Sequence, residues 1–393
     1  MSPHQTRLFA TIGTALIVSA CSDTTATAPR PGAASRSAVK FWEAGSSLAW
    51  NQSARDLIVA RGLSNPGSEA RILTYLSVAQ NNAIVTAEDT KDRGSHASPA
   101  AAAAGASLVV LKSFFPLDAA LLDGKLAAQR AATAWPGEQQ KDFAAGEAVG
   151  RAIGALVVAY AATDRVGLTA APVNPGGPGK WTGVNTARGN YGARTFALLS
   201  GDQFRPGPPP AFGSPAFNEA LAEVRALSDN LTPAQLAIAQ LWNARGPAYM
   251  NSVAAELIVS HHSSEREAAR VLALANMAAF DVLNACFDAK LAYYLIRPSQ
   301  ADPQIHLPIG LPNHPSYPSG HSCITAAYGT VLASAFPDET NRLDAMVEEA
   351  GVSRMYAGLH YRFDCDVGHV LGRQVAEWVL HVAGPGHAAI PLD

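Results

Sequence analysis

Apolar residues recur at intervals of three and four along most of this chain, which is the pattern of amphipathic helices. The pattern is clearest between Val367 and Val382, where the apolar positions fall on one helical face. It predicts further helices over residues 68–89, 139–162, 217–227, 233–243 and 264–296. Runs of alternating β-branched residues, which would indicate strands, are nearly absent. The sequence therefore predicts an all-α protein.

One long segment, residues 164–214, interrupts this helical pattern. It contains the glycine- and proline-rich stretches 174–180 and 205–210, which do not continue a helix. A stretch of this length without regular structure is usually functional or a linker. We expect helical bundles packed around a long irregular central loop.

The composition excludes several classes of protein. With 48% hydrophobic residues, the 393-residue chain can build a core and is not wholly disordered. Its formal net charge of −3 gives no indication of a polybasic nucleic-acid binder, so we expect no nucleic-acid partner. The charged fraction of 16% is low for a soluble protein, and alanine-rich runs account for much of the difference.

The N-terminus has the features of an export signal. Arg7 precedes an apolar run over residues 8–20, which is too short to span a bilayer and ends in Val-Ser-Ala-Cys21. This ending resembles the lipobox of bacterial lipoproteins. It implies a signal peptide over residues 1–21, lipidation of Cys21, a flexible tether over 22–37 and a single exported, membrane-anchored domain over 38–393. The alternative is an ordinary secretory signal in which Cys21 has no role.

The remaining cysteines and an adjacent histidine pair suggest little chemistry. Cys286, Cys323 and Cys365 allow at most one disulfide and leave at least one free thiol. His261 and His262 are neighbours, and a metal pair on a helix favours a spacing of four residues instead. We expect neither group to form a site of its own.

Three short motifs near the C-terminus carry candidate chemistry. In the first, Lys290 and Arg297 are seven residues apart, which is ~700° of rotation on a helix, so both would project from one face. Pro298 would then end that helix. Two cations on one face favour an anion between them, although a solvated basic edge is the simpler interpretation of this motif alone.

The second motif is Pro318-Ser319-Gly320-His321, followed by an apolar run. A proline in the first turn and a hydroxyl at the N-cap are typical of a helix start. The backbone N–H groups of such a turn can hold an oxyanion, and Gly320 lets it approach closely. His321 would place an ionisable imidazole beside it, although an ordinary capped helix has the same residues.

The third motif joins a histidine to a carboxylate. His360 and Asp364 are four residues apart, so on a helix the carboxylate could hold one ring nitrogen and leave the other as a ligand or nucleophile. Arg354 would not share their face on a straight helix, but a bend at Gly358 could bring it close. The alternative is a surface ion pair that contributes less than ~1 kcal/mol.

The order Lys-x6-Arg-Pro, Pro-Ser-Gly-His and Ser-Arg-x5-His-x3-Asp resembles the signature of vanadium-dependent haloperoxidases and type-2 phosphatidic acid phosphatases. The motifs lie within residues 288–372. Upstream, residues 178–181 and 196–210 look like the central loop of secreted bacterial haloperoxidase-like proteins. The resemblance implies an all-α fold with two four-helix bundles around one oxyanion site.

The resemblance also implies roles for the motif residues. In the haloperoxidases, the cofactor is vanadate, and the histidine matching His360 binds vanadium. The one matching His321 handles protons, and the one matching Lys290 polarises hydrogen peroxide before halide attacks it. The carboxylate Asp364 supports His360. The implied oxyanion-binding residues are Lys290, Arg297, Ser319, Gly320 and Arg354.

Two other functions stay open. In the phosphatases of the same superfamily, His360 would attack phosphorus to form a phosphohistidine and His321 would protonate the leaving oxygen. A surface lipoprotein that binds phosphate without catalysis would use the same cations. The residues before the second motif favour a haloperoxidase, because His314 matches a histidine of the bromoperoxidases where fungal chloroperoxidases have phenylalanine. This resemblance implies oxidation of bromide or iodide, with His314 in the halide or peroxide pocket.

Overall fold

The computed structural model describes residues 45–89, 96–132, 142–184, 187–383 and 390–392. The proposed signal peptide, Cys21 and the tether over 22–37 lie outside these ranges. The described residues form thirteen α-helices and no strand, so the predicted all-α class is confirmed. The helices are α2 (Gly45–Ala60), α3 (Pro66–Asp89), α4 (Pro99–Phe114), α5 (Ala119–Ala132), α6 (Phe143–Ala161), α7 (Pro215–Asp229), α8 (Pro233–Asn243), α9 (Pro247–Ser260), α10 (Glu265–Tyr293), α11 (Pro298–Ala301), α12 (Gly320–Ala335), α13 (Thr340–Tyr356) and α14 (Arg362–Val382).

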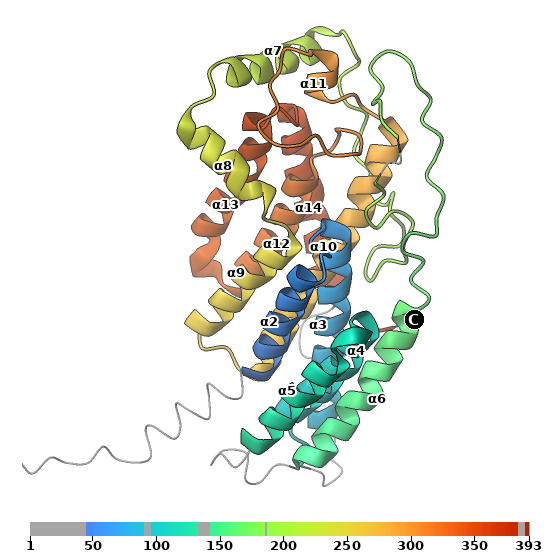
Figure 1. Cartoon of the computed structure of the whole chain (residues 1–393), viewed down its shortest axis with the longest axis vertical. Helices are drawn as coiled ribbons and strands as arrows, with labels where there is room; N and C mark the ends of the chain where they lie inside the picture. Colours follow the sequence, from blue (N-terminus) through green and yellow to red (C-terminus); the bar gives the residue numbers. More distant parts are fainter. Residues whose placement is uncertain (1–44, 90–95, 133–141, 185–186, 384–389, 393) are drawn as a thin grey trace, which may run out of the picture.

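Helix α10 is the centre of the molecule. It packs against α3 on one side and against α12 and α14 on the other (Figure 1). Helices α2, α3, α4 and α6 share one apolar cluster, while α10, α12 and α14 contribute most of a second. The motif residues lie on α10, α12, α13 and α14 or in the loops that adjoin these helices.

Several helix starts follow directly from short polar signals in the sequence. The hydroxyls of Ser98, Ser214 and Thr232 each accept a hydrogen bond from the first helical turn, and a proline follows each of them. A hydroxyl at the N-cap and a proline at the first position satisfy the unpaired N–H groups of a helix start. The predicted helix 233–243 is found with these bounds, as α8.

The end of α10 differs from the prediction. The helix stops at Tyr293, because Tyr294 adopts the left-handed conformation (φ 50°) and its N–H still donates to the Lys290 carbonyl. Arg297 therefore lies outside α10, as the N-cap of α11, and Pro298 begins a helix where we expected it to end one. The expectation that Lys290 and Arg297 share a helix face is wrong.

The long loop after α6 is irregular, as predicted, and two carboxylates of α10 are among the groups that fasten it to that helix. The carboxylate of Asp281 accepts hydrogen bonds of 2.8–3.0 Å from three successive N–H groups, those of residues 196–198. Farther along, Arg205 makes a paired contact with Asp288 at 2.6 and 3.0 Å. Asp288 lies two residues before Lys290, so this contact fixes the loop beside the first motif.

Helices α12 and α14 approach each other unusually closely. A Cβ atom on Gly368 would lie 2.8 Å from the carbonyl oxygen of Ser319, and one on Gly372 would lie 2.5 Å from that of Cys323. Gly368, Gly372 and Asp364 are spaced by four residues, so they share the face of α14 that meets α12. This contact brings Asp364 to the start of α12, where the Ser319 N–H donates to its backbone carbonyl at 2.9 Å.

Among the described residues, α6 and α10 are long and apolar enough to cross a membrane by length and composition alone. In α10, 94% of the apolar window is buried within the protein, as expected for the central helix of a packed core. In α6 the buried share is 28%.

Candidate active site

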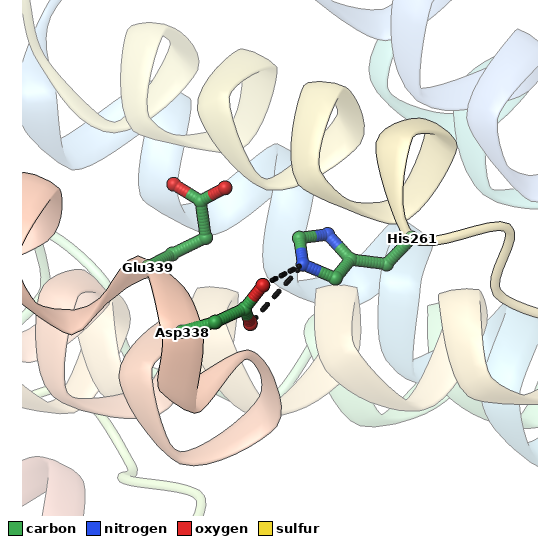
Figure 2. Close-up of side chains that lie close together, drawn as sticks. All are labelled: His261, Asp338 and Glu339. Atoms are coloured by element: carbon green, nitrogen blue, oxygen red, sulfur yellow. Dashed lines mark hydrogen bonds and ion pairs between the residues drawn. The ribbon is translucent and has the colours of Figure 1, made fainter.

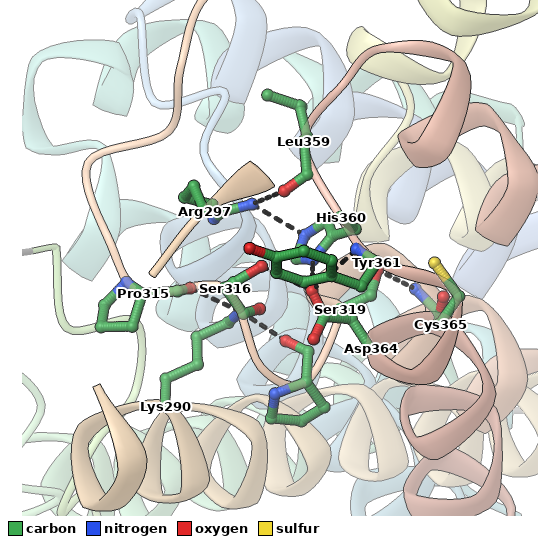
Figure 3. Close-up of polar contacts among 12 residues, drawn as sticks. Lys290, Arg297, Pro315, Ser316, Ser319, Leu359, His360, Tyr361, Asp364 and Cys365 are labelled. Atoms are coloured by element: carbon green, nitrogen blue, oxygen red, sulfur yellow. Dashed lines mark hydrogen bonds and ion pairs between the residues drawn. The ribbon is translucent and has the colours of Figure 1, made fainter. Parts of the chain in front are cut away.

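Lys290 lies on the last turn of α10 and is completely buried. Its ammonium group donates to three backbone carbonyls of the segment before α12: Pro315 at 3.0 Å, Ser316 at 2.7 Å and Pro318 (Figure 3). Burial, together with the positive charge of Arg297, lowers the pKa of this ammonium to about 8. The lysine therefore holds the second motif in place, and no carboxylate of the described residues pairs directly with its charge.

Arg297 reaches the same place from the other side. Its guanidinium donates to the carbonyls of His314 at 3.1 Å and Leu359 at 2.8 Å, and to the ring nitrogen Nε2 of His360 at 3.0 Å (Figure 3). The side chain is fully buried, and this burial lowers the pKa of Arg297 to about 10. Arg297 thus connects the first and third motifs although the two are far apart in the chain.

Arg354 occupies the last turn of α13 and is 1% exposed. Its guanidinium donates to the hydroxyl of Ser353 at 2.9 Å and to the carbonyl of Ala239 at 2.7 Å. Gly358, four residues on, has φ 69°, a conformation that side chains with a Cβ rarely adopt. The chain turns there, as the sequence suggested, before it reaches His360.

His360 is held by Asp364, but outside a helix. His360 precedes Tyr361, the N-cap of α14, so the expectation that a helix carries both residues is wrong. The carboxylate reaches back from the first turn of α14, and its Oδ2 lies 2.8 Å from Nδ1 of the His360 ring. The same oxygen accepts from the hydroxyl of Ser316 and from the N–H of Tyr361 at 3.2 Å (Figure 3).

These contacts determine which nitrogen of His360 carries the proton. A guanidinium only donates, so Nε2 must offer its lone pair to Arg297, and Nδ1 carries the hydrogen that goes to Asp364. Burial and the positive charges of Arg297 and Lys290 lower the pKa of His360 well below its usual range. The ring is therefore neutral, with its basic nitrogen turned toward the cations.

His321 is the second histidine of the cluster and lies on the first turn of α12. Its Nε2 donates to the backbone carbonyl of Trp242 at 2.9 Å, so Nδ1 is its basic nitrogen. Burial and the nearby charge of Arg354 lower the pKa of His321 to about 3. Trp242 is itself fixed, because its indole N–H donates to Glu349 on α13 at 2.8 Å.

The start of α12 supplies neutral donors. Ser319 is the N-cap, and its hydroxyl accepts from the N–H of Ser322 at 3.4 Å. Pro318, which we expected in the first turn, lies before the N-cap, and a cis peptide bond joins it to Tyr317. A Cβ atom on Gly320 would meet no atom within 4 Å, so the first turn is open to an approaching ligand.

His314 lies beside Arg297, whose Nη2 is 3.0 Å from the His314 Nδ1. Its ring packs edge-on against Phe287 with 5.2 Å between the ring centroids. Burial and the charges of Lys290 and Arg297 lower its pKa well below the usual range. His314 is therefore a neutral side chain beside Arg297, and its place in a halide or peroxide pocket stays a prediction.

The side chains of the three motifs form one cluster, which we call the anion cluster and which carries a surplus of positive charge. Lys290, Arg297 and Arg354 are three buried cations, and Asp364 is the buried carboxylate that faces the first two. Burial raises the pKa of Asp364 to about 6, against the lowering effects of Ser316, Lys290 and Arg297. Uncompensated buried charge is costly, so this arrangement favours a bound anion.

The structure thus brings all three motifs to one place, although the chemical role of each residue stays a prediction. Trp242 and Ser316 are contacts that the sequence did not indicate. The Trp242 contact joins residues 79 positions apart, which no local spacing reveals. Cys286, Cys323 and Cys365 are buried free thiols in the structure, so the possible disulfide is not formed.

Residues 269–385 match the sequence profile of the PAP2 superfamily. The match covers this segment and not the rest of the chain. This PAP2 domain contains α12, α13, α14 and most of α10, and hence all three motifs. No curated protein sequence matches the chain significantly.

Solved structures extend the likeness well beyond the PAP2 domain. A bacterial vanadium-dependent iodoperoxidase superposes with a TM-score of 0.65 at 22% identity, covering 88% of this chain and 95% of that one. A bacterial vanadium-dependent chloroperoxidase superposes at 14% identity in two forms. Its apo form gives a TM-score of 0.61 and covers 80% of this chain and 94% of its own. Its holo form gives a TM-score of 0.63 and covers 80% of this chain and 91% of its own. The protein therefore has the all-α fold of the vanadium-dependent haloperoxidases.

Proposed function

We propose that this protein is a vanadate-dependent haloperoxidase that uses hydrogen peroxide to oxidise bromide or iodide to hypohalous acid. The observation that carries the proposal is the buried cluster itself. Three buried cations, two of which face the carboxylate of Asp364, lie close to the basic nitrogen of His360. The fold supports the proposal, because the haloperoxidase likeness covers most of the chain rather than the PAP2 domain alone.

The residues present fit vanadate. An oxyanion of one or two negative charges would balance the surplus of Lys290, Arg297 and Arg354, and Ser319 with the N–H of Gly320 would add neutral donors. Nε2 of His360 is an imidazole lone pair of the kind that transition metals bind. Bound vanadate would supply a Lewis acid that activates hydrogen peroxide without a change of oxidation state.

The chain's own groups would move the protons. Nδ1 of His321 is a neutral base, and Trp242 holds the other ring nitrogen, so Nδ1 can accept a proton from hydrogen peroxide and return it later. Lys290 would have to exchange one of its three carbonyl contacts for a hydrogen bond to the oxygen that halide attacks. Asp364 would keep the Nδ1–H of His360 in place and so keep Nε2 available as a ligand.

The halide assignment rests on His314. Because this neutral histidine borders Arg297, a polar imidazole rather than a phenyl ring lies at the edge of the anion cluster. The bromoperoxidases have a histidine at the matching position and the fungal chloroperoxidases a phenylalanine. Bromide and iodide are also easier to oxidise than chloride, so they are the halides that we expect to turn over.

An assay with and without vanadate tests the proposal. Protein purified in phosphate-free buffer should gain bromide-dependent peroxidase activity when vanadate is added, and phosphate should suppress that gain by competing for the same cations. His360→Ala should abolish the activity, whereas His381→Ala, on the exposed last turn of α14, should leave it unchanged.

The rival functions give opposite results in the same assay. An acid phosphatase would hydrolyse a phosphomonoester without vanadate, and vanadate would inhibit it. A non-catalytic phosphate-binding protein would bind phosphate and show neither turnover. Either result, or wild-type peroxidase activity in His360→Ala, would overturn the proposal.

A further inference from the structure

A second group of metal-ligating side chains lies away from the anion cluster. His261 follows the last residue of α9, while Asp338 and Glu339 belong to the short 3-10 turn Pro337–Glu339 between α12 and α13. One ligand atom from each residue lies within 4.8 Å of the other two (Figure 2). The histidine and the pair of adjacent carboxylates come from two separate parts of the chain, so the fold brings them together.

The hydrogen bonding of His261 directs a lone pair at the carboxylate. Nδ1 lies 2.9 Å from the carbonyl oxygen of Leu257, which can only accept, so Nδ1 carries a hydrogen. The hydroxyl of Ser260 donates to the same carbonyl at 3.0 Å. Nε2 then faces both oxygens of Asp338 at 3.1 and 3.2 Å (Figure 2). A lone pair facing a carboxylate requires a positive species between them, either a proton or a metal ion.

The spacing suits a metal ion. Two ligands bound to a tetrahedral Zn²⁺ at their usual bond lengths lie about 3.3 Å apart, which is close to the observed distances from Nε2 to the Asp338 oxygens. The His261 ring also packs against Phe336, tilted by 37° with 4.6 Å between the ring centroids. The Glu339 carboxylate is partly buried, 24% exposed, and would have to move closer to the ion; its contact with Arg342 is a long one of 3.5 Å.

The local charge also favours a cation. The carboxylates of Asp338 and Glu339 lie beside His261, and Arg342, the cation next to Glu339, pairs with Glu256 at 2.8 Å. We propose that His261, Asp338 and Glu339 bind one divalent transition-metal ion of the Zn²⁺ type. The ion would clamp the end of α9 to the turn between α12 and α13, with water completing its coordination.

The clamp would act at a distance from the anion cluster. Helix α12 carries His321 on its first turn and α13 carries Arg354 on its last, so the turn that joins the two helices lies at their opposite end. Metal binding should therefore stabilise the pair of helices without entering the chemistry of the proposed haloperoxidase. The two proposals can fail independently.

Calorimetric titration of metal-stripped, full-length protein with ZnCl₂ in phosphate-free buffer tests this site. We expect one equivalent to bind and to raise the thermal midpoint. Asp338→Asn and His261→Gln should each weaken the binding at least tenfold, because each removes one of three ligands. His262→Gln is the matched control, since His262 is the exposed neighbour outside the group, and its affinity should equal that of the wild type.

The design separates misfolding from loss of the site. The side chain of Asp338 is 72% exposed, so Asp338→Asn should keep the wild-type circular dichroism spectrum and vanadate activation. Co²⁺ gives a second signal, because its visible bands report the ligands around it. The absence of saturable Zn²⁺ binding in the wild type, or wild-type affinity in His261→Gln, would overturn the assignment.

Discussion

Nη1 of Arg297 lies 3.0 Å from Nε2 of His360, on the side of the ring opposite to Asp364. An arginine and a carboxylate thus hold one imidazole from its two nitrogens, and they fix it as the neutral Nδ1–H tautomer. An oxyanion that reaches Nε2 can take over the hydrogen bond of Arg297 through its own oxygens. The same contacts that satisfy the ring in the described structure therefore prepare it for an anionic ligand.

Asp364→Asn should weaken vanadate binding about 10- to 100-fold, as loss of a partner that orients a metal ligand usually does. The amide can still accept from Nδ1, but it lacks the negative charge that makes His360 more basic. Equilibrium titration of vanadate against bromide-peroxidase activity measures the change.

Ser316→Ala is the matched control for that variant. It removes one of the three hydrogen bonds to Oδ2 of Asp364 while the carboxylate keeps its charge and its contact with His360. A few-fold effect is expected. If Asp364→Asn bound vanadate no more weakly than Ser316→Ala, the charge of Asp364 would have no part in orienting the ligand.

Anion affinity should stay high at low pH and fall above about pH 8. There Lys290, whose pKa is lowered to about 8, loses its proton and its charge. Below about pH 6 Asp364, whose pKa is raised to about 6, takes up a proton, which adds to the positive surplus, so sulfate affinity should not fall on that side. Sulfate is a suitable probe because its own charge is constant over this range. In Lys290→Gln, the fall of sulfate affinity above about pH 8 should be smaller than in the wild type.

The stability of the anion-free protein should show the opposite trend at high pH. The unfolded chain keeps the Lys290 proton up to its ordinary pKa of 10.5, while the folded protein releases it from about pH 8. The unfolded state thus binds more protons in this window, so the free energy of unfolding gains a contribution that rises with pH. Urea unfolding of the wild type and of Lys290→Gln over this pH range measures the contribution of Lys290 to the free energy of unfolding. If this free energy had the same pH dependence in both proteins, Lys290 would titrate normally.

The sequence predicted the membership of the anion cluster better than its geometry. The motif residues could be named because their spacing is specific, but Arg297 and His360 both lie outside the helices that we expected to carry them. The left-handed turn at Tyr294 ends α10 early, and nothing in the local pattern indicates it, because tyrosine adopts that conformation only where the fold requires it. Both side chains reach the cluster through loops that tertiary contacts fix.

Helix α4 was missed for a different reason. Its residues 99–108 are all buried, so the segment is apolar on every side and shows no helical period. The serine-proline start at Ser98 was the available signal. The periodicity of apolar residues reveals helices that have one solvent-exposed face, and it does not reveal helices that the core surrounds on all sides.

Close packing of α12 and α14 gives a stability prediction. Gly372→Ala should destabilise the protein by ~1–3 kcal/mol, because the added methyl would lie 2.5 Å from the backbone oxygen of Cys323 and would push the helices apart. Gly124→Ala is the control, since that exposed glycine of α5 has nothing within 4 Å of an added Cβ. It should stabilise by up to ~1 kcal/mol through helix propensity. Urea unfolding measures both; equal effects would mean that α12 and α14 are not in tight contact.

His314→Phe should lower kcat/KM for bromide about tenfold while changing vanadate affinity only a few-fold. Nδ1 of His314 also lies 3.2 Å from the Pro315 carbonyl, but the shorter contact is with Arg297, which only donates, so Nδ1 is an acceptor. Phenylalanine removes this acceptor. Arg297 keeps its hydrogen bonds to the backbone carbonyl of residue 314, to Leu359 and to His360.

His314→Gln keeps a polar acceptor and should recover part of the bromide activity. Steady-state kinetics with bromide and chloride would measure the ratio of the two halides, which should shift toward chloride in His314→Phe. An unchanged ratio and an unchanged kcat/KM would remove His314 from the halide-binding site.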